Sequence, residues 1–403
     1  MYAIRLELGR ELEDLLFRNM QAKRDEEELA ELKYRAKRAW YIRKISKLAG
    51  FLGFFIGILI FVFADISKYH ELKEIEERNS KRQTFVAAHP MIDITVLEEE
   101  REKERQIEER KSTQYYAAET SETTGMGEDV ISQYGIVIDV NNDTILAARD
   151  GKTRMYPASM TKVMTVLVAA ENIPEEKLDE EVTVTPEVNY YASSHGASRV
   201  GFVDNETVKV RDLFYGTILP SGADAAVTLA TYVAGSHEAF VDMMNERVAE
   251  LGLSDTTHFT NCVGLFDNDH YSTCYDMAMI MHAAINTPLC REVMSTRTYT
   301  TTPTDQHPNG IEISNWFLRR AEDKPIGATL MCAKTGYVKE SGNCATSYAR
   351  DDKGNDIIIV TGNSNGSWRC IYDHIALYRK FFPDFDPSSA DAGKEAAEAG
   401  EEN

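Results

Sequence analysis

Three short motifs in the second half of the chain carry the groups that acyl transfer requires. They are Ser159-Met160-Thr161-Lys162, Ser221-Gly222-Ala223 and Lys334-Thr335-Gly336. Residues three apart on a helix share a face, so the Lys162 amine can hydrogen-bond the Ser159 hydroxyl and act as its base. This set, in this order, is typical of serine enzymes that use lysine in place of histidine.

The segments around these motifs predict how they are positioned. Residues 160–170 are apolar on nearly every face, which predicts a buried helix where Lys162 has no structural purpose. Ser221 follows a proline between two apolar, helix-like runs and is therefore expected on a loop. Two β-compatible runs, 328–333 and 344–349, predict a hairpin with Lys334 on its inner strand. Each motif alone can also be explained without catalysis: Ser159 and Ser221 as helix N-caps, and Lys334 as a lysine on a surface strand.

Together, the motifs make the stretch from about Asp129 to Phe385 resemble a known family. This family is the D-alanyl-D-alanine carboxypeptidases, the low-molecular-mass penicillin-binding serine peptidases of family S11. The stretches that carry the resemblance are Tyr156–Lys162, Leu219–Ala226, Gly264-Leu265, His270–Thr273 and Lys334–Tyr337. The fold implied is α+β, an α/β sandwich of the β-lactamase and DD-peptidase type, with helices on both faces of an antiparallel sheet. A hairpin over 135–148, strands at Lys334 and 357–360, and a helix over 373–382 fit it.

The resemblance implies a D-Ala-D-Ala carboxypeptidase that acts on peptidoglycan pentapeptide stems. Ser159 would attack the carbonyl between the two terminal D-alanines and form an acyl-enzyme. Lys162 would take the proton in its neutral form, because burial and the nearby Lys334 both lower its pKa. Ser221 would pass the proton to the leaving D-alanine. β-Lactam antibiotics resemble this terminus, so they would acylate Ser159 and leave slowly.

The third motif would bind the substrate. Lys334 and Thr335 would hold the substrate carboxylate, and Gly336 would leave room for the substrate to pair with the strand edge. The oxyanion hole would be the backbone N–H of Ser159 and, by resemblance, that of Tyr337. No metal or cofactor is expected. The sequence has neither H-E-x-x-H nor G-x-S-x-G, which argues against a metallopeptidase and an α/β-hydrolase.

One position departs from the family pattern. Ala223 stands where the family usually has Asn, and its methyl group can neither brace the lysine nor hold a substrate amide; Asp224 is common to the pattern and is not an obvious replacement. A non-catalytic sensor of wall peptide or β-lactam therefore remains an alternative. A β-lactamase is a third reading, although no E-x-x-x-N loop follows the second motif.

Arg199 and Arg369 are candidate carboxylate contacts, but salt-bridged or surface positions are favoured. His195 is interpreted as a loop residue.

The N-terminal part predicts a membrane anchor. Residues 1–47 are charged and helix-like, and 48–64 form an uncharged apolar run. As a helix, this run would be about 25 Å long, the short end for a bilayer span. Basic residues before it and Asp65 after it predict a cytoplasmic N-terminus and an extracellular catalytic domain at a bacterial cell membrane. The alternatives are a buried core helix and a cleaved signal peptide, for which a 47-residue leader is unusually long.

The remaining boundaries follow from composition. Residues 65–128 are highly charged and predict a stalk or linker, 129–385 the catalytic domain, and 386–403 an acidic disordered tail. A net charge of −21 makes the chain a poor surface for nucleic acid, and no nucleic-acid partner is expected. The oligomeric state is left open.

All six cysteines fall in the predicted external domain, where disulfides are permitted. The suggested pairs are Cys262–Cys274, Cys332–Cys344 and Cys290–Cys370, and the alternative is six buried thiols.

Overall fold

The computed structural model describes residues 30–31, 33–35, 37–38, 115–382 and 385. The chain divides into two compact units, 1–112 and 113–403. In the first unit, the described residues are helical and exposed. The predicted membrane span 48–64, the acidic tail 386–403 and most of the predicted stalk 65–128 lie outside the described residues. None of the described helices combines the length and apolar character that crossing a bilayer requires.

The second unit is organised around one six-stranded sheet with the order β1-β3-β2-β10-β9-β8. Its strands are β1 (Ala118–Thr124), β2 (Tyr134–Asp139), β3 (Thr144–Arg149), β8 (Thr329–Val338), β9 (Gly342–Arg350) and β10 (Asp356–Ser364). The predicted hairpins β2–β3 and β8–β9 are confirmed. The predicted inner position of Lys334 is wrong, because β9 pairs with β10 and leaves β8, which carries Lys334, as the edge strand. The antiparallel sheet is correct except at one edge, where β1 runs parallel to β3, so the sheet is mixed. β1 starts eleven residues before the predicted domain boundary at Asp129.

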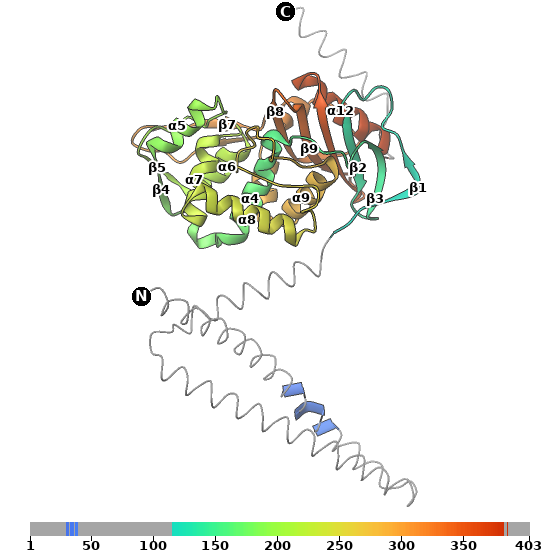
Figure 1. Cartoon of the computed structure of the whole chain (residues 1–403), viewed down its shortest axis with the longest axis horizontal. Coiled ribbons are helices and arrows are strands. Elements are labelled where there is room, and N and C mark those ends of the chain that lie inside the picture. The colour runs from blue at the N-terminus through green and yellow to red at the C-terminus, as the bar shows by residue number, and fades with distance from the viewer. Residues whose placement is uncertain (1–29, 32, 36, 39–114, 383–384, 386–403) are drawn as a thin grey trace, which may run out of the picture. The chain divides into compact units, whose positions relative to one another are not determined.

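Helices cover both faces of the sheet, as predicted. Neighbouring residues on a strand point to opposite faces. Ile136, Ile138 and Ile358 belong to the larger core with α4 (Lys162–Asn172) and α9 (Cys274–Asn286). Val137 and Ile359 belong to the smaller core with α11 (Trp316–Ala321) and α12 (Ser367–Phe381). Figure 1 shows α12 and α9 on either side of the sheet.

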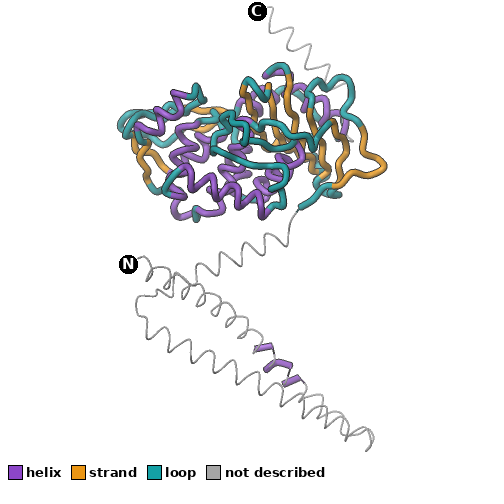
Figure 2. Tube along the Cα trace, in the orientation of Figure 1, coloured by secondary structure: helices purple, strands orange, loops and turns teal. Residues whose placement is uncertain are grey.

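A mainly helical part lies beside the sheet (Figure 2). Its elements are η2 (Glu175–Lys177), β4 (Glu181–Val184), α5 (Pro186–Ser194), β5 (Glu206–Lys209), α6 (Val210–Ile218), α7 (Ala223–Ala234), α8 (His237–Glu250), α10 (Pro288–Ser295), β6 (Thr298–Thr300) and β7 (Glu312–Ser314). Helix α4, preceded by the 3-10 turn η1 (Ala158–Thr161), is buried from Lys162 to Ala169. The predicted buried helix over 160–170 is therefore confirmed.

All six cysteines are buried free thiols. The suggested disulfides are therefore wrong: Cys262–Cys274, Cys332–Cys344 and Cys290–Cys370. Cys344 pairs with Gly336 across the β8–β9 ladder, whereas Cys332 lies four residues away on β8, about 13 Å along the strand. That separation is too long for a disulfide. Cys290 and Cys370 belong to cores on opposite faces of the sheet.

Candidate active site

The three motifs converge on two lysine–serine pairs. Lys162 Nζ donates to Ser159 Oγ at 3.1 Å, and Lys334 Nζ donates to Ser221 Oγ at 2.9 Å. The first pair comes from η1 and α4, and the second joins β8 to the loop between α6 and α7. The convergence expected from the motifs is therefore observed.

The residue before Ser159 has an unusual backbone conformation, and neighbouring residues hold it in place. Ala158 has φ +47°, the left-handed region that residues other than glycine seldom occupy. Gly264 lies against this peptide, and a Cβ added there would be 1.8 Å from the Ala158 carbonyl oxygen. Only glycine allows this approach. Such strained conformations persist where the surroundings fix them, and they cluster at functional sites.

Lys162 has the environment that a lysine base requires. Its side chain is 2% exposed, and Nζ donates to the Val263 carbonyl oxygen at 2.7 Å as well as to Ser159. Burial lowers the pKa of Lys162 to about 8, although Cys262 and Asp224 act in the opposite direction. Burial is the main cause of this shift, since desolvation disfavours the charged amine. At neutral pH, a larger fraction of the Lys162 amine is therefore neutral than in a lysine of ordinary pKa.

Lys334 is equally buried and lies near the first lysine. Burial lowers the pKa of Lys334 well below its ordinary value, and the charge of Lys162 lowers it further. Its Nζ also donates to the carbonyl oxygen of Thr335 at 2.8 Å. The Ser221 oxygen thus accepts from an amine, which leaves its own proton available for donation. Ser221 itself has φ +63°.

The loop from 261 to 265 holds the Lys162 amine, and the motifs did not predict this. Asn261 Oδ1 accepts from the backbone N–H groups of Val263, Gly264 and Leu265 at 3.2, 2.7 and 2.9 Å. These bonds fix the turn whose Val263 carbonyl accepts from Lys162. Gly264-Leu265 carried part of the family resemblance, and this was the only sequence signal for the loop.

His270 ties the same loop to the nucleophile turn, and it also had no predicted role. Its Nε2 lies 2.8 Å from Thr161 Oγ1, and its Nδ1 accepts from the Thr260 N–H at 3.1 Å. Burial lowers the pKa of His270 to about 3, so the ring is neutral at physiological pH. With Nδ1 as acceptor, Nε2 carries the proton and donates to Thr161.

Gly336 brings β8 into contact with the nucleophile. A Cβ added to Gly336 would be 2.9 Å from the Ser159 nitrogen and 2.8 Å from Cys344 Sγ. β8 is the outermost strand of the sheet, so its second edge is available for a further strand. Thr335 is half-buried and the side chain of Tyr337 is 63% exposed at this edge.

The middle motif has no side-chain amide. Ala223 is fully buried, and its N–H donates to the Ser198 carbonyl oxygen at 2.7 Å. Asp224 accepts from the N–H groups of Val200 and Gly201 at 2.9 and 3.0 Å. Asp224 therefore anchors the neighbouring loop and does not replace the missing asparagine.

The other candidates lie in ordinary structural positions. Arg369 pairs with Asp373 at 3.2 Å and also donates to the Asp129 carbonyl, as the salt-bridge reading predicted. Arg199 is exposed. His195 is an exposed residue at the end of α5 whose Nδ1 lies 2.8 Å from the Tyr191 carbonyl oxygen. Within the described ranges, no group of His, Cys, Asp and Glu side chains is arranged to hold a metal ion.

The sequence matches a family model described as D-alanyl-D-alanine carboxypeptidase over residues 118–365. It is 30% identical over 229 residues to the D-alanyl-D-alanine carboxypeptidase DacF of Bacillus subtilis, covering 57% of each chain. It is 31% identical over 274 residues to the DacA enzyme of Haemophilus influenzae, covering 67% of this chain and 66% of the relative. The chain thus matches less than two thirds of the length of these curated relatives.

Solved structures show the same architecture. The Streptomyces K15 DD-transpeptidase superposes with a TM-score of 0.57 at 26% identity, covering 62% of this chain and 97% of that one. Penicillin binding protein 5 from Haemophilus influenzae superposes with a TM-score of 0.56 at 28% identity, covering 63% and 71% of the two chains.

Proposed function

This chain belongs to the D-alanyl-D-alanine carboxypeptidase family, peptidase S11, and on that premise we propose that it removes the terminal D-alanine from peptidoglycan stem peptides. Ser159 is the proposed nucleophile, and the intermediate is an acyl-enzyme on its oxygen. The observation that carries the proposal is the buried Lys162 amine, which lies 3.1 Å from the Ser159 hydroxyl oxygen and has a lowered pKa.

The proposed proton path begins at Ser159. Its Oγ bonds to the substrate carbonyl carbon while neutral Lys162 takes the hydroxyl proton. The proton reaches the leaving D-alanine nitrogen through Ser221 as the peptide bond breaks, so Lys162 is neutral again. Water then attacks the ester, Lys162 accepts its proton and returns it to the Ser159 oxygen. No net proton remains on the enzyme.

The proposed binding site for the substrate terminus is Lys334 with Thr335. An arriving carboxylate favours the charged form of Lys334, because it offsets the burial and the repulsion that lower the pKa of this amine. Gly336 supports the strand-like placement of the substrate, since β8 is an edge strand in contact with the Ser159 backbone. The N–H groups of Ser159 and Tyr337 are the proposed oxyanion hole.

The test is D-alanine release from a synthetic peptide that ends in D-Ala-D-Ala. The chain should release D-alanine, and Ser159→Ala should not. Ser193→Ala, an exposed serine at the end of α5, is the matched control and should keep full activity. Release that persists in Ser159→Ala would refute the assignment of the nucleophile.

A sensor that binds β-lactams without turnover is a second candidate, because Ala223 offers no amide to a substrate. Stable penicillin acylation of Ser159 without D-alanine release would select this function. Rapid turnover of the β-lactam would instead select a β-lactamase.

We also propose that residues 48–64 anchor the protein in the bacterial cell membrane with the catalytic unit outside. The apolar run and the basic residues before it support this orientation. Deleting 48–64 should move the protein from the membrane fraction to the supernatant. Protease added to intact cells should cleave the catalytic unit, and full protection of that unit would contradict the proposed topology.

A further inference from the structure

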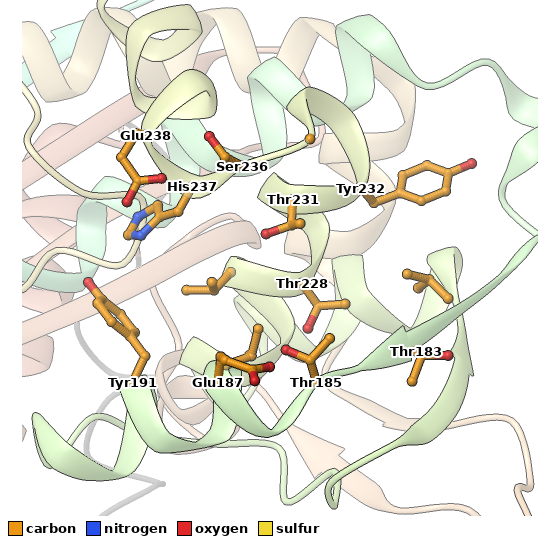
Figure 3. Close-up of a pocket in the computed structure, with 14 residues that line it drawn as sticks. Thr183, Thr185, Glu187, Tyr191, Thr228, Thr231, Tyr232, Ser236, His237 and Glu238 are labelled. Carbon is orange, nitrogen blue, oxygen red and sulfur yellow. The ribbon is translucent and has the colours of Figure 1, made fainter.

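A pocket lies in the helical part, and no residue of the two lysine–serine pairs lines it. It has a volume of about 590 Å³, within the range of small-molecule sites. Its walls come from β4, the first two turns of α5, the second half of α7 and the start of α8. Figure 3 shows Glu187 and Tyr191 of α5 across from Thr231, His237 and Glu238 of α7 and α8.

The charge of this pocket disfavours anions. Glu187 and Glu238 line it, and none of its described lining residues is Lys or Arg. The Glu187 backbone N–H and the Thr185 hydroxyl hold the pKa of the Glu187 carboxyl low, so it is ionised at neutral pH. Burial lowers the pKa of His237, which keeps its ring neutral. The pocket therefore presents negative charge.

The pocket also presents hydrogen-bond donors, and a simple cation would leave these unused. His237 Nε2 accepts from the Cys262 N–H at 3.0 Å, so its Nδ1 carries the proton. Within residues 115–382, this Nδ1–H has no acceptor, and the hydroxyls of Tyr191 and Thr231 have no partner. Together with the two carboxylates, the lining offers donors and acceptors side by side.

We propose that this pocket binds a saccharide. Each sugar hydroxyl both donates and accepts, which matches a lining of carboxylates beside N–H and O–H donors. The half-buried Tyr191 ring, which contacts the rings of His195 and His237, adds apolar carbon surface to the wall for the C–H groups of a pyranose. The source we favour is the amino-sugar strand that carries the stem peptides, and this last step rests on the proposed function.

The test is calorimetric titration of the full chain with tri-N-acetylchitotriose, in a detergent without a sugar headgroup. Glu238→Ala should weaken binding about tenfold, as expected for a lost charged hydrogen bond. Glu246→Ala is the matched control, because Glu246 is an exposed residue of the same helix outside the pocket. Tyr191→Phe keeps the ring and should weaken binding about fivefold. Thermal melting of each variant checks that the fold is kept.

Several results would overturn the proposal. One is the absence of binding up to about 10 mM chitotriose. Another is an equal affinity of the Glu238→Ala and Glu246→Ala variants for chitotriose. Prior acylation of Ser159 by benzylpenicillin should leave the affinity for chitotriose unchanged. Loss of binding after acylation would show that the saccharide binds at the peptide site and not in this pocket. Failure to acylate would count against the proposed function alone, because the Glu238 comparison still tests the pocket. Equal binding of maltotriose would keep the saccharide site and reject its assignment to amino sugars.

Discussion

Acylation of Ser159 by benzylpenicillin should accelerate between pH 7 and pH 9, because the proposed base is the neutral form of Lys162. Burial lowers the pKa of Lys162 from 10.5 to about 8. With that pKa, about a tenth of the amine is neutral at pH 7, about half at pH 8 and about nine-tenths at pH 9. The neutral fraction of an ordinary lysine at pH 7 is only about 0.03%. The acylation rate constant should therefore rise about tenfold over this range and level off above it.

The assay is rapid quenching followed by intact-mass analysis, at a saturating concentration of benzylpenicillin and constant ionic strength. Saturation removes any contribution from weaker carboxylate binding by Lys334 at high pH. Lys162→Arg should abolish acylation at every pH, because a guanidinium does not lose its proton. Lys177→Arg is the matched control, since Lys177 is an exposed lysine at the end of η2, and its profile should equal that of the unmodified chain.

A rate that stays constant or falls between pH 7 and pH 9 would refute the role of neutral Lys162 as the base. A midpoint above pH 10 would also refute it, because Lys162 would then have the pKa of an exposed lysine despite its burial. Persistent acylation of Lys162→Arg with the normal profile would show that another group is the base.

Three further predictions concern stability, backbone packing and the thiols. Lys162→Met should be more stable at pH 7 by about 3 kcal/mol in urea unfolding, the free energy of a shift of about 2.5 pKa units. The unfolded chain binds more protons than the folded one, so the unmodified chain should gain stability from pH 8 to pH 10.5. The variant should gain less over this range because, of the two buried lysines, only Lys334 still contributes there. Gly336→Ala should lower the acylation rate at least about tenfold with an unchanged circular dichroism spectrum, because the added Cβ lies 2.9 Å from the Ser159 nitrogen; a normal rate would contradict this. Ellman's reagent should react with none of the cysteines in the native chain and with six after unfolding without reductant, whereas four or fewer would indicate disulfides.

Much of the fold could be predicted because local patterns determine it. The turn at Asn141–Asp143 gave the β2–β3 hairpin, and the apolar run after Ser159 gave the buried helix α4. β1 could not be predicted, because Ala118–Thr124 has no apolar alternation and is exposed. It is held by pairing with β3, which is a tertiary contact. The disulfide pairs were wrong because spacing along the chain does not report separation across a sheet.

The candidate site could be predicted where side chains carry the chemistry, and not where the backbone does. Ser159, Lys162 and Lys334 stand out because hydroxyls and amines occur in otherwise apolar segments. The second acceptor of the Lys162 amine is the carbonyl oxygen of Val263, and a carbonyl has no residue signature. The Asn261 side chain that orients this loop is remote from the motifs in sequence and meets them only in the folded chain.

The proposed mechanism depends above all on formation of the acyl-enzyme at Ser159. The most direct measurement is peptide mapping by mass spectrometry after treatment of the full chain with benzylpenicillin. One penicilloyl adduct is expected, located on the peptide that contains Ser159 and absent from Ser159→Ala. An adduct on Ser221 or elsewhere, or no adduct in a chain that is folded, would contradict it.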